Sequence, residues 1–323
     1  MTEWTPDILG SGFMQRTLPL KTPGDHGPLV ATIVRHPPDP FTAWAKPLRD
    51  VDVLYVHGWS DYFFQTELAD FWTGLGARFH ALDLHRYGRS LRPGEVPGYV
   101  DSLHDYDEDI EAALSAMGHG PHRRLLLLGH STGGLVLTLW AARNPGVADA
   151  LVLNSPWLEF QAGALGRQAI APIVNARARV QPRGQQPVVD LGFYTRAQTE
   201  LGSIPTEGYR TDWRPPQGFA THPGWLSAIL SGHATVAAGV DVGCPVLVLI
   251  SNRSSSPIRW SADMTATDSV LVVDDIARAA LRIGRLVTVA RIEGAIHDVF
   301  LSAPEARQAS YDVVRDWSIG RFR

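Results

Sequence analysis

Short apolar runs and segments with helical spacing alternate along most of the chain. Six of the apolar runs have the length of a β-strand. Most are continuous and do not alternate with polar residues, a pattern typical of strands buried on both faces of a parallel sheet. The predicted strands are Val51–Val56, Phe79–Leu84, Arg124–Leu128, Ala150–Asn154, Val246–Ser251 and Leu286–Ile292.

Helical patterns fall between these strands. Because strands and helices alternate, the sequence predicts an α/β fold with a mostly parallel central sheet and helices on both faces. The first 50 residues are expected to add an antiparallel pair, near Gln15–Leu20 and Leu29–Arg35. The predicted helices are Thr66–Leu75, Ser102–Met117, Gly134–Arg143, Asp275–Ile283 and Glu305–Trp317.

One segment, residues 156–243, interrupts the alternation. It contains no clear buried strand and is rich in proline, glycine, arginine and aromatic residues. Compact domains rarely contain a structureless loop of this length. We therefore predict that residues 1–155 and 244–323 form the core, and that residues 156–243 form an inserted, mostly helical cap. A separate accessory domain is the alternative.

Composition excludes several classes of function. The net charge of the 323 residues is −4, without the basic excess typical of proteins that bind duplex nucleic acid. The two lysines, Lys21 and Lys46, lie outside any phosphate-binding G-x-x-x-x-G-K-[ST] motif. The single cysteine, Cys244, excludes an internal disulfide and any cysteine-based metal cluster. No metal or organic cofactor is predicted.

The N-terminal residues have neither the basic start nor the apolar stretch of a secretory signal. No apolar run approaches the roughly 18 residues that a membrane span needs. The sequence therefore predicts a cytoplasmic protein without a membrane span.

The motif with the most chemical content is Gly-His-Ser-Thr-Gly at residues 129–133. It directly follows a predicted strand and directly precedes a helical pattern. In that context G-x-S-x-G is typical of a tight turn that lifts a serine hydroxyl above the end of a sheet. Ser131 is therefore the candidate nucleophile.

Four further segments resemble the α/β-hydrolase superfamily, in particular its lysophospholipase, monoacylglycerol lipase and serine aminopeptidase S33 branch. Residues 56–59 (Val-His-Gly-Trp) end a strand, and residues 83–90 resemble the D-x-x-G-x-G-x-S turn, with Arg86 in place of the first glycine. Residues 153–156 resemble the exit from the strand before the cap. Residues 294–298 (Gly-Ala-Ile-His-Asp) resemble the late loop that carries the family's histidine. The resemblance implies the α/β-hydrolase fold.

A serine hydroxyl needs a base to become a good nucleophile. His297 is the candidate base, since it follows the last predicted strand on a loop able to reach Ser131. His130 neighbours the serine, but its side chain is expected to point elsewhere. His57 is expected to order the loop that follows its strand.

The acid of the triad departs from the family pattern. The loop after Val246–Ser251, where the family usually places an aspartate, contains no carboxylate at residues 252–257. Asp268 comes later, ahead of a helix and 29 residues before His297, and resembles the family's D-x-V-x-x-V segment. We predict that Asp268 orients His297. Glu159 and then Asp263 are the alternatives.

The resemblance also implies an oxyanion hole made by the backbone N–H groups of Trp59 and Thr132. Aromatic residues cluster in the predicted cap and suggest an apolar substrate pocket. Its expected lining comprises His57, His130, Trp157 and Trp225, with packing in the core as the alternative role for the tryptophans.

These features predict a serine hydrolase that cleaves a small-molecule carboxylic ester through an acyl-enzyme. The expected substrate is a monoacyl ester, a lysophospholipid or a lactone. Hydrolysis of a carbon–carbon or peptide bond by the same triad is an alternative. A non-catalytic protein that binds ligands on the same fold is another.

Overall fold

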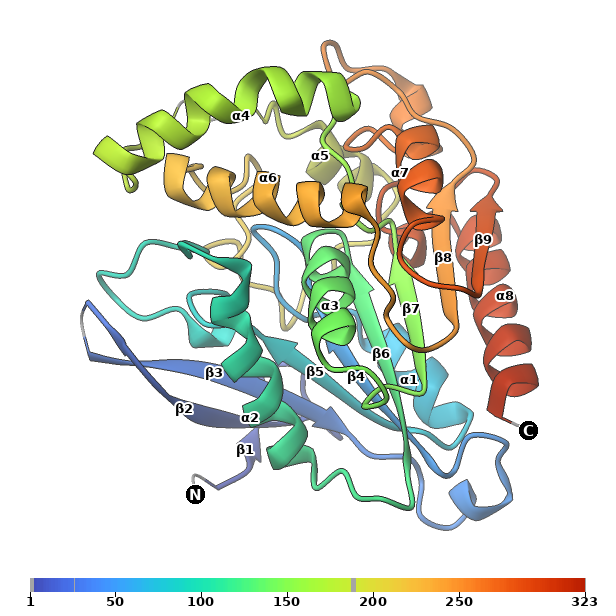
Figure 1. The fold of residues 1–323 in the computed structure, drawn as a ribbon. Coiled ribbons are helices and arrows are strands. Elements are labelled where there is room, and N and C mark those ends of the chain that lie inside the picture. Colours follow the sequence, from blue (N-terminus) through green and yellow to red (C-terminus); the bar gives the residue numbers. More distant parts are fainter. Residues whose placement is uncertain (1–2, 26, 187–189, 323) are drawn as a thin grey trace.

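The computed structural model describes residues 3–25, 27–186 and 190–322, and among these nine strands form a single sheet (Figure 1). Its strand order is β1-β2-β3-β5-β4-β6-β7-β8-β9. The strands are β1 (Thr5–Pro6), β2 (Met14–Gly24), β3 (Gly27–His36), β4 (Val51–Val56), β5 (Arg78–Asp83), β6 (Arg124–His130), β7 (Ala150–Asn154), β8 (Val246–Ser251) and β9 (Val287–Ile292).

The predicted sheet, mostly parallel with an antiparallel pair from the first 50 residues, is confirmed. Strands β4 to β9 pair in parallel, and β1, β2 and β3 join them as an antiparallel extension through β5. All six predicted buried strands form, within two residues at each end. Continuous apolar runs therefore identified strands that are covered on both faces.

Two hydrophobic cores lie on opposite faces of the sheet. In β4, Leu54 and Val56 join one core, whereas Val53 and Tyr55 join the other. The first core includes side chains of α2 (Asp107–Met117), α3 (Thr132–Arg143) and α7 (Val273–Ala280). The second includes side chains of α1 (Thr66–Gly74) and α8 (Pro304–Phe322). Every central strand is thus desolvated on both sides.

One predicted helix is divided in two. The segment expected as Ser102–Met117 begins as a 3-10 helix, Leu103–Tyr106, and α2 starts at Asp107. Ser102 accepts a hydrogen bond from the His104 N–H, and Asp105 accepts one from the Ser102 N–H. This capping box starts a tight first turn, which then widens into α2.

Three helices form between β7 and β8: α4 (Gly163–Val180), α5 (Phe193–Glu200) and α6 (Pro223–Ala238). Residues 187–189 of this segment lie outside the described residues. The helices lie beyond the carboxyl ends of the parallel strands, with α4 outermost and α6 between α4 and α3 (Figure 1). Helix α6 approaches the core closely at Gly232, where a Cβ atom would lie 2.8 Å from Leu103.

No helix in the described part of the chain is long and apolar enough to cross a bilayer.

Candidate active site

The turn between β6 and α3 holds Ser131 in a strained conformation. Its φ is 51° and its ψ is −116°, a region that side-chain-bearing residues rarely occupy. A Cβ atom at Gly133 would lie 2.3 Å from the His57 carbonyl oxygen, and one at Gly129 would lie 2.7 Å from the Gly134 Cα. Only glycine permits this close approach of strand, turn and helix.

Ser131, His297 and Asp268 form a continuous hydrogen-bonded chain. The His297 Nε2 lies 3.0 Å from the Ser131 Oγ, and the His297 Nδ1 lies 2.9 Å from the Asp268 Oδ2. A carboxylate only accepts hydrogen bonds, so Nδ1 carries the proton and Nε2 is free to accept the serine proton. All three side chains are buried. The arrangement allows the imidazole to remove a proton from the serine hydroxyl.

The loop after β8 explains how the acid can come so late in the chain. The backbone of Asp268 pairs with this loop: its carbonyl accepts from the Ser255 N–H at 2.9 Å, and its N–H donates to the Arg253 carbonyl at 3.1 Å. The intervening residues therefore form an excursion that returns beside the end of β8. The second carboxylate oxygen, Oδ1, accepts from the N–H groups of Val270 and Leu271, each at 2.8 Å. These bonds hold the carboxylate in one orientation.

The two alternative acids are engaged elsewhere. Glu159 pairs with Arg167 at 2.8 Å, and hydrogen bonds from Arg167 and Phe160 overcome its desolvation and lower its pKa. Asp263 pairs with Arg253 at the surface. The structure thus brings Asp268 to His297, and it places neither Glu159 nor Asp263 there.

The buried side chain of Asn154, for which the sequence predicted no role, links the two loops that carry Ser131 and His297. The Asn154 carbonyl, at the end of β7, accepts from the Ser131 N–H at 3.0 Å. The Asn154 side-chain amide donates to the Asp298 Oδ1 at 2.7 Å and accepts from the Val299 N–H at 3.1 Å. Asp298 also accepts from Gln65 at 3.2 Å. Asn154 therefore connects the serine turn directly to the histidine loop.

Both predicted oxyanion donors lie near the serine, since Thr132 follows it in the chain and Trp59 belongs to the loop packed against its turn. Neither the Trp59 N–H nor the Thr132 N–H donates a hydrogen bond to another group of the described chain. Ser60, next to Trp59, has a φ of 51°. A Cβ atom at Gly58 would come within 3.1 Å of the Ser131 Cβ, which brings the Trp59 loop against the serine turn. Two amides are thus available to bind an oxygen.

Hydrogen bonds to backbone groups hold the two histidines near the serine. The His57 Nδ1 lies 2.8 Å from the Gly58 carbonyl and its Nε2 accepts from the Leu84 N–H at 3.2 Å. The His130 Nδ1 donates to the Asn154 carbonyl at 3.2 Å, and burial lowers the pKa of His130. His57 therefore supports the Gly58–Trp59 turn.

A cavity of about 110 Å³ opens over Ser131 and His297, and both polar and apolar side chains line it. Asp61 and Arg214 pair in its wall, with 2.8 Å between the Asp61 Oδ1 and the Arg214 Nε. Arg214 also donates to Gln198 at 2.8 Å. The hydroxyls of Ser60 and Tyr194 are buried and have no partner in the described chain. These residues are not predictable from the sequence, because nothing in their spacing links residues 60–61 to residues 194–214.

The expected apolar lining differs from this cavity. His130 lines it, whereas His57, Trp157 and Trp225 do not. Trp225 packs against Trp59 with ring centroids 3.7 Å apart and ring planes tilted by 35°, and against Trp157 with centroids 6.0 Å apart. The tryptophans pack against one another because this contact buries their large apolar ring surfaces, and Trp59 is the member that also lines the cavity.

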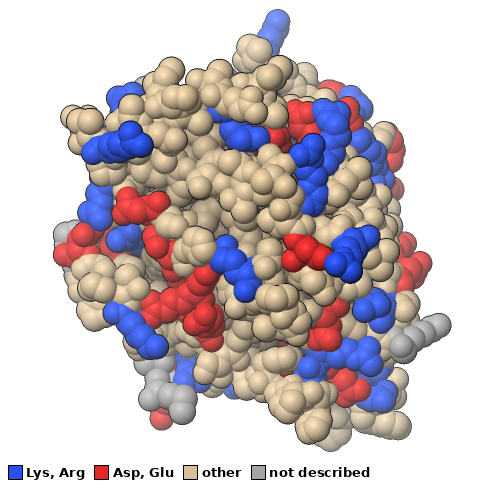
Figure 2. Space-filling view, viewed as in Figure 1, with Lys and Arg blue, Asp and Glu red and all other residues tan. Residues whose placement is uncertain are grey.

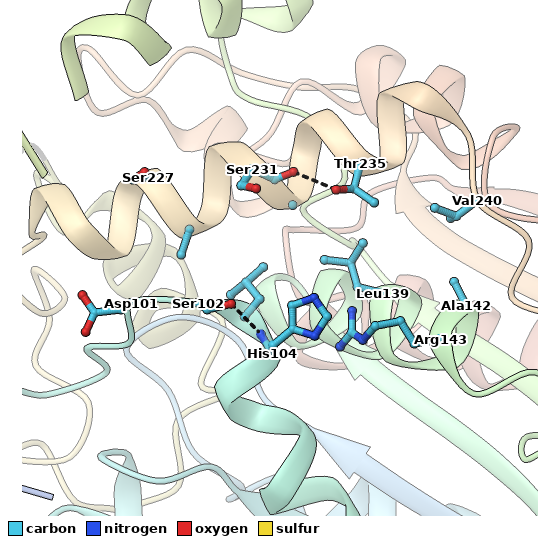
Figure 3. Close-up of a pocket in the computed structure, with 13 residues that line it drawn as sticks. Asp101, Ser102, His104, Leu139, Ala142, Arg143, Ser227, Ser231, Thr235 and Val240 are labelled. Atoms are coloured by element: carbon cyan, nitrogen blue, oxygen red, sulfur yellow. Dashed lines mark hydrogen bonds between the residues drawn. The ribbon is translucent and has the colours of Figure 1, made fainter. Parts of the chain in front are cut away.

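A larger cavity of about 430 Å³ lies between α6 and α3, and Figure 3 shows its lining side chains. Arg143 lines it and pairs with Asp107, and the His104 Nδ1 lies 3.4 Å from the Asp107 Oδ2. It shares no lining residue with the cavity at Ser131. No group of three or more His, Cys, Asp or Glu side chains in the described part of the chain could hold a metal ion.

Comparisons with known proteins agree with this fold. The chain is 38% identical over 85 residues to lysophospholipase L2 of Escherichia coli, a match that covers 25% of each protein. It is 28% identical over 130 residues to the monoacylglycerol lipase of Mycolicibacterium smegmatis, covering 40% of the chain and 43% of the lipase. The matches therefore cover less than half of these relatives.

Solved structures resemble the chain over nearly its whole length. A soluble variant of monoglyceride lipase from Saccharomyces cerevisiae aligns with a TM-score of 0.66 at 15% identity, over 95% of this chain and 96% of the other. A carboxyl esterase from Bacillus coagulans aligns with a TM-score of 0.67 at 14% identity, over 97% and 100%. The predicted α/β-hydrolase fold is confirmed.

The family model described as serine aminopeptidase, S33, matches residues 49–253, which is more than half of the chain. The chain therefore belongs to the serine aminopeptidase S33 family of α/β-hydrolases.

Proposed function

We propose that this chain is a serine hydrolase that cleaves carboxylic esters. The observation that supports this most is the buried hydrogen-bonded chain from Ser131 through His297 to Asp268. It combines a strained, glycine-flanked serine with a base and an orienting carboxylate, as nucleophilic catalysis requires.

In the proposed reaction the Ser131 Oγ attacks the ester carbonyl carbon while its proton moves to the His297 Nε2. The carbonyl oxygen becomes an oxyanion, which the amides of Trp59 and Thr132 stabilise by about 3 kcal/mol each. Collapse expels the alcohol, which takes the proton from His297. Water then attacks the acyl-enzyme by the same route, so that the acid is released and Ser131 regains its proton. Asp268 stabilises the imidazolium in both halves.

The proposed substrate is a monoacyl ester, such as a lysophospholipid, or a lactone. Relatives named lysophospholipase and monoacylglycerol lipase support an ester of this kind. The polar wall formed by Asp61, Arg214 and Tyr194 suits an ester with a polar alcohol portion. Because the cavity is small, the alcohol portion of the ester fits against this wall better than a long acyl chain does.

We also propose that residues 156–243 form a cap that selects the substrate. Several residues of this segment line the cavity opposite the serine, among them Asp190, Tyr194, Thr195 and Arg214. Substitutions in this wall are expected to change KM more than kcat.

A fluorophosphonate probe tests the central claim, because it reacts only with an activated serine. The folded chain should be labelled at Ser131, and Ser131→Ala should remove both the labelling and the turnover of p-nitrophenyl esters. A folded wild-type chain that resists the probe, yet binds lipids in the cavity, would instead support the non-catalytic binding protein.

A further inference from the structure

Helix α4 has two apolar faces, and only one of them is covered. Its inner face carries the buried Val174 and packs along α6. Its outer face carries an apolar stripe at helical spacings of three, four and seven, and every member is exposed. We call this set the α4 stripe, and it consists of Leu165, Ala169, Pro172, Ile173, Ala176 and Val180.

The exposure of the α4 stripe is large. Leu165 is 82% exposed, Ile173 is 69% exposed and Val180 is 79% exposed. Contiguous exposed apolar surface of this kind is typical of a site that contacts another protein or a membrane. A helix that only covered α6 would need one apolar face, because its solvent side would be polar.

The charged side chains of the segment that carries the α4 stripe are all arginines, and Asp275 lies near the N-terminal end of the helix. Residues 161–189 contain four arginines and no aspartate or glutamate, although the chain as a whole carries a net charge of −4. Arg167 is buried against Glu159, whereas Arg177 and Arg179 are exposed and flank the stripe. Figure 2 shows this surface as mostly uncharged, with basic side chains toward the C-terminal end of α4.

The position of α4 leaves the stripe accessible. The helix is the outermost element beyond the carboxyl ends of the strands (Figure 1). The loop after β8 rises to the same end of the molecule and carries Ile258, which is 82% exposed, followed by Arg259 (Figure 1). Two separate segments therefore present an apolar side chain with adjacent arginine at this end.

We propose that the α4 stripe docks this chain onto the surface of an anionic lipid bilayer. An amphipathic helix that lies in the plane of a bilayer buries an apolar face and places Lys or Arg beside the headgroups. The stripe supplies the apolar face, and Arg177 and Arg179 supply attraction for anionic lipids. The docking needs no catalysis, so it can be tested separately from the proposed ester hydrolysis.

The test measures binding of the full chain to vesicles of equal parts phosphatidylcholine and phosphatidylglycerol by co-sedimentation. Wild type should bind, and should bind more weakly to pure phosphatidylcholine. Leu165→Gln/Ile173→Gln/Val180→Gln should lower the partition coefficient about tenfold or more, since three apolar contacts are lost. Arg177→Gln/Arg179→Gln should lower it roughly tenfold to thirtyfold. Both variants should retain the wild-type far-UV circular dichroism and turnover of a water-soluble ester.

The matched control removes a second exposed apolar pair. Phe41 and Trp44 are 86% and 73% exposed, and they lie on the loop before β4. Phe41→Gln/Trp44→Gln should leave vesicle binding unchanged. The proposal is overturned if wild type does not bind, or if the α4 triple variant binds as wild type does. It is also overturned if the triple variant changes only the oligomeric state, which would identify the stripe as an interface between copies of the chain.

Discussion

The two walls of the cavity at Ser131 are built in different ways. On the sheet side, Ser131 and Asp268 are held mainly by hydrogen bonds to backbone groups, and glycines permit the tight turn. On the side of residues 156–243, the side chains of Arg214, Gln198 and Asp61 hold one another. Backbone contacts constrain many neighbouring residues at once, whereas a side-chain cluster depends on each of its members. This difference fits the proposal that the sheet wall carries out the reaction and that the opposite wall selects the substrate.

The sharpest test of this contrast compares two carboxylates. Asp268→Asn should lower kcat by about 10⁴-fold, because an amide no longer favours the imidazole tautomer that accepts the serine proton. Glu159→Gln should leave kcat within about twofold, because Glu159 pairs with Arg167 and not with His297. Steady-state turnover of a p-nitrophenyl ester measures both. Near wild-type turnover in Asp268→Asn would show that Asp268 does not act as the acid of the triad.

The glycines of the sheet wall give the next largest effect. Gly133→Ala would place a Cβ atom 2.3 Å from a backbone oxygen, and we expect a loss of about 4 kcal/mol or more in the free energy of unfolding. Gly74→Ala is the matched control, since no atom lies within 4 Å of its added Cβ. Urea unfolding of the two variants checks this. Equal stabilities would show that the turn relaxes easily.

Acid should destabilise the packing of residues 156–243 through His233 of α6, which does not itself line the cavity. Burial lowers the pKa of this histidine to about 4, below its value of about 6.5 in an unfolded chain. The unfolded state therefore binds the proton more tightly, and about 3 kcal/mol of stability is lost as the pH falls from about 6.5 to about 4.

The variant His233→Gln isolates this effect. Its side-chain amide can still donate to the Trp157 carbonyl, which the His233 Nε2 reaches at 2.9 Å, but it does not titrate. The unfolding free energy of the variant should therefore fall less steeply over this pH range. His80 of β5, with a pKa lowered by burial to about 3, should still contribute to the remaining acid dependence.

The smallest effect is expected where the serine turn joins the histidine loop. Asn154→Ala removes both side-chain bonds to that loop, and displacement of His297 should lower kcat by about 10²-fold with little change in KM. Asn154→Asp keeps the acceptor for the Val299 N–H but places a second carboxylate against Asp298, so it should not restore kcat. A change confined to KM would assign Asn154 to substrate binding instead.

Much of the fold follows from the sequence alone. Continuous apolar runs predicted the buried strands, because a strand covered on both faces has no exposed side that must be polar. Gly-His-Ser-Thr-Gly between a strand and a helix identified Ser131, since a turn this tight needs small residues two positions before and two positions after the serine. The spacing after β8 pointed to Asp268 for a similar reason: one helix and one strand separate it from His297.

Only the tertiary structure decided what surrounds these residues. The pairing of Asp61 with Arg214 joins positions more than 150 residues apart, and nothing in either local sequence specifies it. The aromatic residues of the 156–243 segment were expected over the substrate, but Trp225 instead packs between Trp59 and Trp157. Local spacing determines which elements form and which faces are apolar. Which apolar faces meet, and which remain exposed as on α4, depends on how the whole chain packs.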